Sequence, residues 1–263
     1  EADHLDYFKD LADVQNSFRR FAKLSSGGVL ANGDDPHTLQ AMEGVDCVTF
    51  GLKEHNRVRA ANICPDWRHL DILCDDQFYC HLDLKVLGRH NALNALAAAG
   101  TAWMLGIPGE AVTRGIATFS GAERRMQFKG NYNGAEVYDD YAHHPDELAA
   151  TIEAVRTMEP KRIVVAFQPH TYTRTKALFD EFVRELKKAD VVVLAEIYAA
   201  RERNTVGVSS RDLAAKISGS VYCETLPEVT DYLRSIAQPG DVVLTIGAGD
   251  IYRAGEALLK ENV

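Results

Sequence analysis

The densest set of chemically active side chains in the sequence combines two carboxylates, a phenol and two imidazoles within six residues. It lies in the run Asp139-Asp140-Tyr141-Ala142-His143-His144-Pro145. Residues 134–138 alternate in polarity as a β-strand does, and a proline is typical of the first turn of a helix. The cluster is therefore predicted to lie where a strand ends and a helix begins, which is where ligands bind in open α/β sheets.

Two kinds of chemistry fit this cluster. Asp140 could accept hydrogen bonds from a ribose or position a magnesium-bound phosphate. Alternatively, the two carboxylates and the two histidines could ligate a transition metal, because imidazole and carboxylate ligands suit zinc, iron or manganese. Neighbouring side chains point apart, which counts against all four converging on one ion. A capped turn that carries surface histidines is the purely structural interpretation.

A second cluster follows the next predicted strand, residues 163–167. His170, Arg174 and Lys176 would face the same crevice as His143 if the two strands are neighbours. Arginine is suited to this role because its guanidinium binds a carboxylate through two parallel hydrogen bonds. The structural alternative is that the threonines of this stretch only cap the helix that follows.

A third cluster, Arg89-His90-Asn91-Ala92-Leu93-Asn94, opens a helix rich in alanine and leucine. Asn91 and Asn94 are three residues apart and lie near one edge of the helix start. Asn91 could be a simple N-cap. Asn94 lies one turn further in, where a nucleobase with its mixed donors and acceptors would explain an amide. Asp3-His4 near the N-terminus and the turn at 247–250 are weaker signals.

The elements that carry these clusters change in character at residues 119–122. Before this point the sequence predicts a helix over residues 5–24 with one buried stripe, and short antiparallel strands between residues 57 and 86. After it, strands and amphipathic helices alternate, and the strands at 163–167, 191–197 and 242–246 are almost continuously apolar, as parallel strands buried on both faces are. The sequence thus predicts an α/β protein with a small antiparallel sheet first and a Rossmann-like sheet second.

Composition excludes several classes of protein. The formal net charge is −9, which is opposite to the balance of a nucleic-acid binder. No apolar run approaches the roughly 18 residues that span a bilayer, and the charged N-terminal residues are not typical of a secretory signal. The five cysteines show no C-x-x-C pair, so we expect reduced thiols and a cytoplasmic protein. Arg124-Arg125 could hold a phosphorylated small molecule.

Taken together, the spaced motifs resemble the Mur ligase family, the ATP-dependent amide-forming enzymes of peptidoglycan precursor assembly. The motifs occur in the family's order and span essentially the whole chain: Asp3-His4-Leu5-Asp6, Gly88-Arg89-His90-Asn91 with Asn94, Arg124-Arg125 and Asp140-Tyr141-Ala142-His143. One departure is clear, because the family's phosphate loop of the G-x-x-G-K-[ST] type is absent. The resemblance implies a fragment: residues 1–119 as the latter part of the central ATP-binding domain, and residues 120–263 as the C-terminal domain.

The resemblance also implies an activity, in which ATP and Mg²⁺ activate the carboxylate of UDP-N-acetylmuramate as an acyl phosphate and the amine of L-alanine attacks it. It implies that His4 binds the magnesium ion. The other implied contacts are Asn91 and Asn94 to adenine; Arg125, Asp140 and Tyr141 to the rest of the nucleotide; and His143, His170 and Arg174, with Tyr141, around the reacting carboxylate and amine.

Three alternatives stay open on the sequence. A ligase that attaches a preformed tripeptide to the same sugar nucleotide has similar motifs. A metal-dependent hydrolase would use residues 139–144 as its metal site. A non-catalytic nucleotide-binding module is the third. Because the phosphate loop is absent, we expect the chain by itself to have little or no ligase activity.

Overall fold

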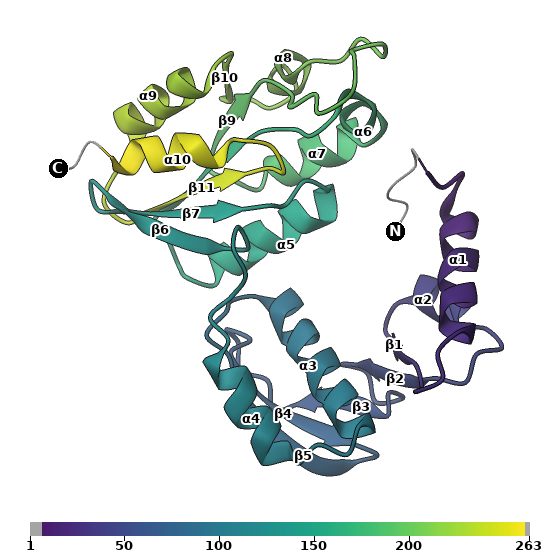
Figure 1. Ribbon diagram of the computed structural model, residues 1–263. Helices are drawn as coiled ribbons and strands as arrows, with labels where there is room; N and C mark the ends of the chain where they lie inside the picture. Colours follow the sequence, from purple (N-terminus) through teal and green to yellow (C-terminus); the bar gives the residue numbers. More distant parts are fainter. Residues whose placement is uncertain (1–6, 261–263) are drawn as a thin grey trace. The chain divides into compact units, whose positions relative to one another are not determined.

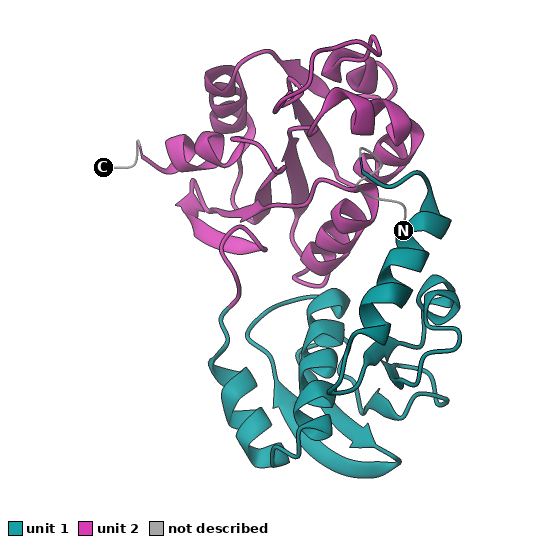
Figure 2. Cartoon of the chain, turned by 45° about the vertical axis from the view of Figure 1, so that its right-hand side comes forward, with its two compact units in different colours: residues 1–120 teal, residues 121–263 magenta. Residues whose placement is uncertain are grey.

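The computed structural model describes residues 7–260, and the chain divides into two compact units, residues 1–120 and 121–263 (Figure 2). The first unit is built on a five-stranded sheet and the second on a six-stranded sheet. The predicted α/β class with two sheets of different character is confirmed. His4, the predicted magnesium ligand, lies outside the described residues.

The first unit has the strand order β1-β2-β3-β4-β5, in which β1, β2 and β3 are parallel and β4 and β5 are antiparallel to their neighbours. Its elements are labelled in Figure 1: α1 (Leu11–Lys23), β1 (Leu30–Asn32), α2 (Pro36–Ala41), β2 (Val48–Gly51), β3 (Val58–Ala61), β4 (His69–Cys74), β5 (Gln77–Asp83), α3 (Arg89–Met104) and α4 (Gly109–Thr118).

Helix α1 differs from the expected helix over residues 5–24. It begins at Leu11 because the Asp10 side chain accepts the main-chain N–H of Asp13 at 2.9 Å and caps the first turn. The expected buried stripe is not formed, since Phe18 is 57% exposed and Phe21 is 73% exposed. The apolar side of α1 instead borders an open depression of about 540 Å³ beside α2 and β1.

The hairpin of β4 and β5 follows its alternating sequence closely. Leu70, Ile72 and Leu82 are buried on one face, while the side chains of the other face are half-buried or exposed. Asp75 and Asp76 form the turn, both with positive φ, which matches the right-handed twist of a two-residue hairpin loop.

The second unit has the strand order β10-β9-β8-β11-β7-β6, and every pair is parallel except β6 with β7. Its elements are β6 (Gln127–Tyr132), β7 (Ala135–Asp140), α5 (Pro145–Arg156), β8 (Arg162–Phe167), α6 (Tyr172–Ala177), α7 (Phe179–Leu186), β9 (Val191–Ala195), α8 (Ser210–Ala214), β10 (Val221–Cys223), α9 (Leu226–Ile236), β11 (Asp241–Ile246) and α10 (Tyr252–Leu259) (Figure 1).

Strand β6 was not among the elements predicted from the sequence. It pairs with β7 through the turn at Asn133 and Gly134, both of which have positive φ. Asn-Gly between two strands is a strong hairpin signal, so this strand was predictable from the local sequence.

Helices cover both faces of the second sheet. Helices α5, α7 and α8 pack over one face, and α9 and α10 pack over the other (Figure 1). Every residue of β11 is buried, as expected for a central parallel strand. All five parallel strands end at the same edge of the sheet, so the loops that follow them gather there. Among residues 7–260, no helix is long and apolar enough to cross a bilayer.

We expect Phe182→Ala to lower the free energy of unfolding by about 3–5 kcal/mol, because it would leave a cavity in this core. Phe182 of α7 and Phe167 of β8 are both fully buried, with ring centroids 5.3 Å apart. Chemical denaturation followed by circular dichroism measures the loss. Phe78→Ala is the control, since Phe78 is 65% exposed and should cost less than about 1 kcal/mol. Equal losses would contradict this packing.

Candidate functional site

The loops after β7, β8 and β11 meet at the C-terminal edge of the second sheet. The sequence predicted that the first and second clusters would share a crevice if their strands, β7 and β8, were neighbours. The two strands are not neighbours, because β11 lies between them. The two predicted clusters nevertheless meet, since the rings of His143 and His170 have their centroids 6.0 Å apart. The loop after β11 must therefore leave room for its neighbours to approach each other.

Two glycines in the loop after β11 provide that room. A Cβ atom on Gly247, whose φ is +150°, would lie 2.6 Å from the carbonyl oxygen of Gln168. A Cβ atom on Gly249 would lie 2.3 Å from Oε1 of Gln168 and 2.7 Å from the ring of Tyr198. Only glycine allows this approach. The segment after β8 can thus lie against the end of β11.

Gln168 holds this contact in place. It is buried, its Nε2 donates to Asp250 Oδ1 at 3.0 Å, and its Oε1 accepts the main-chain N–H groups of Asp250 and Ile251 at 2.9 and 3.1 Å. The side chain therefore ties the end of β8 to the start of the segment that leads into α10.

Arg124 joins the loops after β7 and β11. Its Nε donates to Oδ2 of Asp139 at 2.9 Å, its Nη1 donates to the carbonyl of Gly249 at 3.1 Å, and its Nη2 donates to the carbonyl of Gly247 at 2.6 Å. Asp139 is 1% exposed, and Arg124 is the cation that compensates its charge. Arg124 and Asp139 are thus structural partners. From the sequence, Arg124 was a candidate to bind a phosphate, and Asp139 was a candidate to bind a metal.

Two tyrosines enclose the Arg124 guanidinium. Its carbon lies 4.9 Å from the ring centroid of Tyr141 and 4.7 Å from that of Tyr252, which are cation–π distances. The carbonyl of Arg124 also accepts the N–H of Tyr141 at 2.6 Å. Tyr141 is 36% exposed, so one part of its ring packs on Arg124 and another part borders solvent.

Asp140 is buried and engaged with the main chain. One carboxylate oxygen accepts the N–H of Met126 and the other accepts the N–H of Ala142, both at 2.8 Å. Burial raises the pKa of the Asp140 carboxyl, while these hydrogen bonds and the charge of Arg125 oppose the rise. The carboxylate therefore anchors the residue that follows Arg125. Its contact with a ribose stays a prediction.

Arg125 is more accessible than its neighbour. Its side chain is half exposed, Nη1 lies 3.5 Å from Oε1 of Glu147, and its guanidinium carbon lies 5.7 Å from the ring centroid of Tyr141. A half-exposed guanidinium beside an aromatic ring can bind a phosphate or a carboxylate by donating hydrogen bonds to its oxygens.

His144 caps helix α5. Its Nδ1 accepts the N–H of Asp146 at 3.3 Å, and Glu147 accepts the N–H groups of His143 and His144 at 2.9 and 3.2 Å, which completes a capping box. Sequence patterns that mark helix starts emphasise serine, threonine, aspartate and asparagine, so a histidine cap followed by proline is easily overlooked.

Three of the four side chains considered as a metal set have structural partners of their own. Asp139 pairs with Arg124, Asp140 binds main-chain N–H groups, and His144 caps a helix. Within the part of the chain that the structure describes, three or more metal-ligating side chains converge only at His69, His81 and Asp83, in the first unit. The geometry disfavours a metal-dependent hydrolase at residues 139–144.

The tautomer of His143 follows from its hydrogen bond. Nδ1 lies 3.0 Å from the carbonyl oxygen of Tyr141, and a carbonyl can only accept. The neutral ring therefore carries its proton on Nδ1 and keeps a lone pair on Nε2. The Glu147 carboxylate lies 3.4 Å from the same Nδ1, so this nitrogen faces two oxygen acceptors.

His170 has the opposite tautomer. Nη1 of Arg174 lies 3.3 Å from its Nδ1, and a guanidinium can only donate, so the neutral ring carries its proton on Nε2. The ring stacks on Tyr198 with centroids 5.7 Å apart. Burial lowers the pKa of His170, and the charges of Arg174 and His143 lower it further. His170 is therefore neutral near pH 7.

Thr171 has an unusual main-chain conformation that sets the direction of this loop. Its φ is +65°, which is costly for a β-branched residue. Its N–H donates to the carbonyl of Tyr198 at 2.9 Å, and its carbonyl accepts Oγ1 of Thr175 at 2.6 Å. These bonds hold the strained turn that presents His170.

The site thus offers one imidazole with a free lone pair and one with an N–H group, together with an arginine. A lone pair can take a proton from an amine, and the N–H and guanidinium groups can bind a carboxylate or an oxyanion. Lys176, the remaining cation of the second cluster, is exposed on α6 and makes none of these contacts.

The predicted adenine ligands lie on α3 in the first unit. Nδ2 of Asn91 donates to the carbonyl of Leu87 at 2.8 Å, so this amide secures the helix start. Asn94 is exposed, and the structure shows no hydrogen bond of its side chain to the described residues. Its donor and acceptor are thus available to a ligand.

The depression beside α1 does not offer comparable chemistry. Asp35, one of the six polar residues in its lining, uses its carboxylate to accept the N–H groups of His37 and Thr38 and the Thr38 hydroxyl. The remaining walls are mainly apolar. Its size alone does not make it the better candidate.

Two family models match the sequence. Residues 1–102 match the Mur ligase middle domain, and residues 124–249 match the Mur ligase glutamate ligase domain. Among curated proteins, the chain is similar to the UDP-N-acetylmuramate–L-alanine ligase of Clostridium novyi, with 43% identity over 99% of the chain and 59% of that protein. The ligase of the same name from Acetivibrio thermocellus is 41% identical, over 100% of the chain and 58% of that protein. The chain spans about three fifths of the length of these relatives.

Solved structures give a consistent result. The UDP-N-acetylmuramate–alanine ligase MurC of Thermotoga maritima superposes with a TM-score of 0.80 and 26% identity, covering 99% of this chain and 57% of that one. A murein peptide ligase from Psychrobacter arcticus superposes with a TM-score of 0.67 at 18% identity, over 97% of this chain and 56% of that one, which shows the shared fold.

We expect nuclear magnetic resonance titration of the His170 ring to give a pKa below 6.5, because burial and the Arg174 charge both disfavour the imidazolium. Arg174→Met should raise this pKa but leave it below the ordinary value, since burial remains. Lys176→Met removes an equal charge from the exposed side of the same helix and should leave it unchanged. A His170 pKa that does not respond to Arg174→Met would contradict the contact.

Proposed function

This chain belongs to the Mur ligase family, and we propose that it is part of an ATP-dependent ligase that joins L-alanine to the carboxylate of UDP-N-acetylmuramate. The names of the two relatives at 43% and 41% identity support this choice of substrates. The observation that carries the proposal is the group formed by His143, His170 and Arg174 at the strand ends of the second unit.

We assign residues 1–119 to the ATP-binding middle domain of the family and residues 120–263 to its C-terminal domain. The family models that match residues 1–102 and 124–249 support this division. The product would be a precursor of peptidoglycan, and the enzyme would serve the synthesis of the cell wall.

Arg174 is proposed to bind the carboxylate. A guanidinium pairs with a carboxylate through two hydrogen bonds, and Arg174 lies beside a ring that is neutral near pH 7. ATP supplies the phosphoryl group that turns this carboxylate into an electrophile. The charge of Arg174 and the Nε2–H of His170 would then offset the negative charge that develops on the oxygen during attack.

His143 is proposed to take the proton from the attacking amine. An ammonium has no lone pair, so alanine must lose a proton to react. Nε2 of His143 can accept it, while Nδ1 keeps the ring in place by facing the Tyr141 carbonyl and the Glu147 carboxylate. Tyr141 lies against this ring, with centroids 5.5 Å apart, and restricts its orientation.

The nucleotide contacts are proposed for each unit separately. In the first unit, the exposed amide of Asn94 can pair with a nucleobase edge, while Asn91 holds the helix start from which it projects. In the second unit, the half-exposed Arg125 can bind a phosphate, and Asp140 fixes the adjacent residue Met126. Tyr141 would border the nucleotide beside Arg125.

Mg²⁺ fits this chemistry because it neutralises phosphate charge, and the family is generally ATP- and Mg²⁺-dependent. His4 is proposed as one of its ligands.

A chimeric ligase provides the direct test. This chain would replace the matching 59% of the Clostridium novyi ligase, and formation of UDP-N-acetylmuramoyl-L-alanine would be measured with ATP and Mg²⁺. We expect turnover that depends on both ATP and L-alanine. Faster turnover with a preformed tripeptide would identify the tripeptide ligase instead. A soluble, folded chimera that ligates neither substrate would contradict the proposal.

In that chimera, His143→Ala and Arg174→Ala should each lower kcat/KM about 100-fold or more, as expected when a general base or an oxyanion partner is removed. Lys176→Ala is the matched control. This exposed cation lies on the same helix as Arg174, and none of its contacts among the described residues involves His143 or His170. Equal effects of Arg174→Ala and Lys176→Ala would count against the assigned site.

The chain on its own is expected to show no ATP- and alanine-dependent ligation, because its sequence contains no G-K-[ST] phosphate loop. Phosphate release is measured with the purified chain, and the chimera serves as the positive control. Turnover by the chain alone would overturn this expectation.

A further inference from the structure

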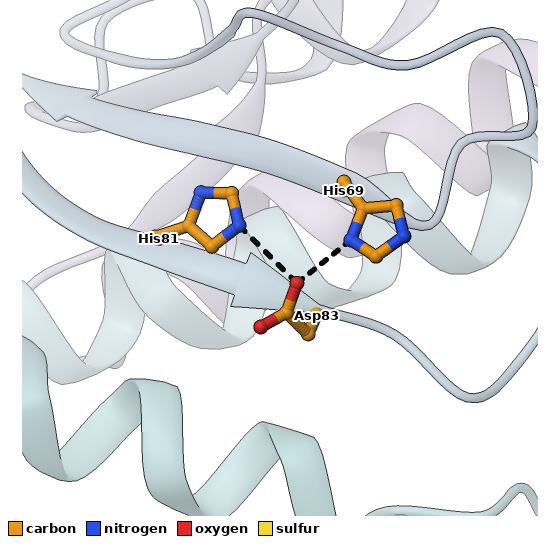
Figure 3. Close-up of side chains that lie close together, drawn as sticks. All are labelled: His69, His81 and Asp83. Atoms are coloured by element: carbon orange, nitrogen blue, oxygen red, sulfur yellow. Dashed lines mark hydrogen bonds and ion pairs between the residues drawn. The ribbon is translucent and has the colours of Figure 1, made fainter.

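Histidine and aspartate side chains gather on the solvent-facing side of the β4–β5 hairpin in the first unit, and three of them are drawn in Figure 3. The antiparallel register places His69 opposite Asp83 and Asp71 opposite His81. On each strand the two polar residues are two positions apart, so all four side chains share one face. Leu70 and Leu82 point to the opposite, buried face.

Three of these side chains converge on one point. Nδ1 of His69 lies 2.7 Å from Oδ1 of Asp83, and Nε2 of His81 lies 3.2 Å from the same oxygen (Figure 3). The possible ligand atoms of the three residues all lie within 4.8 Å of one another. No other group of this kind is found among residues 7–260.

The fourth side chain orients one of the three. Oδ1 of Asp71 lies 2.6 Å from Nδ1 of His81, which directs Nε2 of that ring toward Asp83. Asp71 is itself held by Nδ2 of Asn62, at 2.7 Å from its second oxygen. A carboxylate on the far nitrogen of a metal-binding histidine is the usual outer partner in metal sites, because it fixes the tautomer and the ring direction.

We propose that His69, His81 and Asp83 form a binding site for a divalent transition-metal ion, with Nδ1, Nε2 and Oδ1 as the respective ligand atoms and Asp71 as the positioning residue. Two imidazoles and one carboxylate are a ligand set that suits Zn²⁺ and its first-row neighbours. The ion would replace the protons that now link both rings to Asp83. Water would complete its coordination, since the three side chains are about half exposed.

This site is separate from the proposed ligase chemistry and shares no residue with it. The metal would link His69 of β4 to His81 and Asp83 of β5, and would so hold the two strands together. The alternative is a set of cross-strand ion pairs between protonated histidines and aspartates. That alternative also explains the short contacts, but it requires no affinity for a metal.

The purified chain is titrated with Zn²⁺ by calorimetry and with Co²⁺ by absorption spectroscopy. We expect one ion bound per chain, and a Co²⁺ spectrum without a sulfur-to-metal charge-transfer band, which excludes the cysteines as ligands. His69→Ala and His81→Ala should each weaken binding more than 10-fold. His37→Ala, which removes an exposed histidine elsewhere in the unit, should leave it unchanged.

Nitrogen-detected resonance spectra of the histidines identify the ligand atoms. Zn²⁺ should shift Nδ1 of His69 and Nε2 of His81, and leave His37 unaffected. Asp71→Asn should weaken binding about 10- to 100-fold while retaining the folded spectrum, as loss of an outer carboxylate does. Zn²⁺ should raise Tm of the chain but not that of His81→Ala. Unchanged affinity in the His69→Ala and His81→Ala variants, or no binding by the parent chain, would overturn the proposal.

Discussion

The candidate site depends on the charge pair between Arg124 and the buried Asp139. A carboxylate that is 1% exposed is stable only when its charge is compensated. Arg124 provides this compensation, and its Nη1 and Nη2 groups donate hydrogen bonds to the carbonyls of Gly249 and Gly247. One side chain therefore joins the end of β7 to the loop after β11. Without it, both loops would carry unsatisfied polar groups.

The rest of the edge is built outward from this junction. Gly247 and Gly249 lack side chains, so Gln168 can lie against the loop and bind its N–H groups. Gln168 lies two residues before His170, and Tyr141, stacked on Arg124, lies two residues before His143. The two imidazoles are thus positioned by groups that are themselves held by hydrogen bonds. Such support restricts the orientations that the two rings can adopt.

The two histidines differ because their partners differ. A carbonyl facing Nδ1 of His143 leaves a lone pair at Nε2, whereas a guanidinium facing Nδ1 of His170 leaves a proton at Nε2. The same residue type can therefore act as a proton acceptor at one position and as a hydrogen-bond donor at the other. The hairpin of the first unit uses the same principle, since Asp71 selects the nitrogen of His81 that faces Asp83.

Local sequence determined the element types and the places of the polar clusters. Apolar runs at β8, β9 and β11 predicted buried parallel strands, and the motifs around Asp140 and His170 predicted strand-end sites, because these signals depend only on neighbours in the chain. The family resemblance came from the same motifs. Even β6 was signalled locally, by Asn133 and Gly134. Tertiary structure alone decided that β11 lies between β7 and β8, that Asp140 is buried on main-chain N–H groups and that the apolar face of α1 is exposed. Strand order and burial depend on contacts between distant segments, and side-chain spacing along the chain does not encode them.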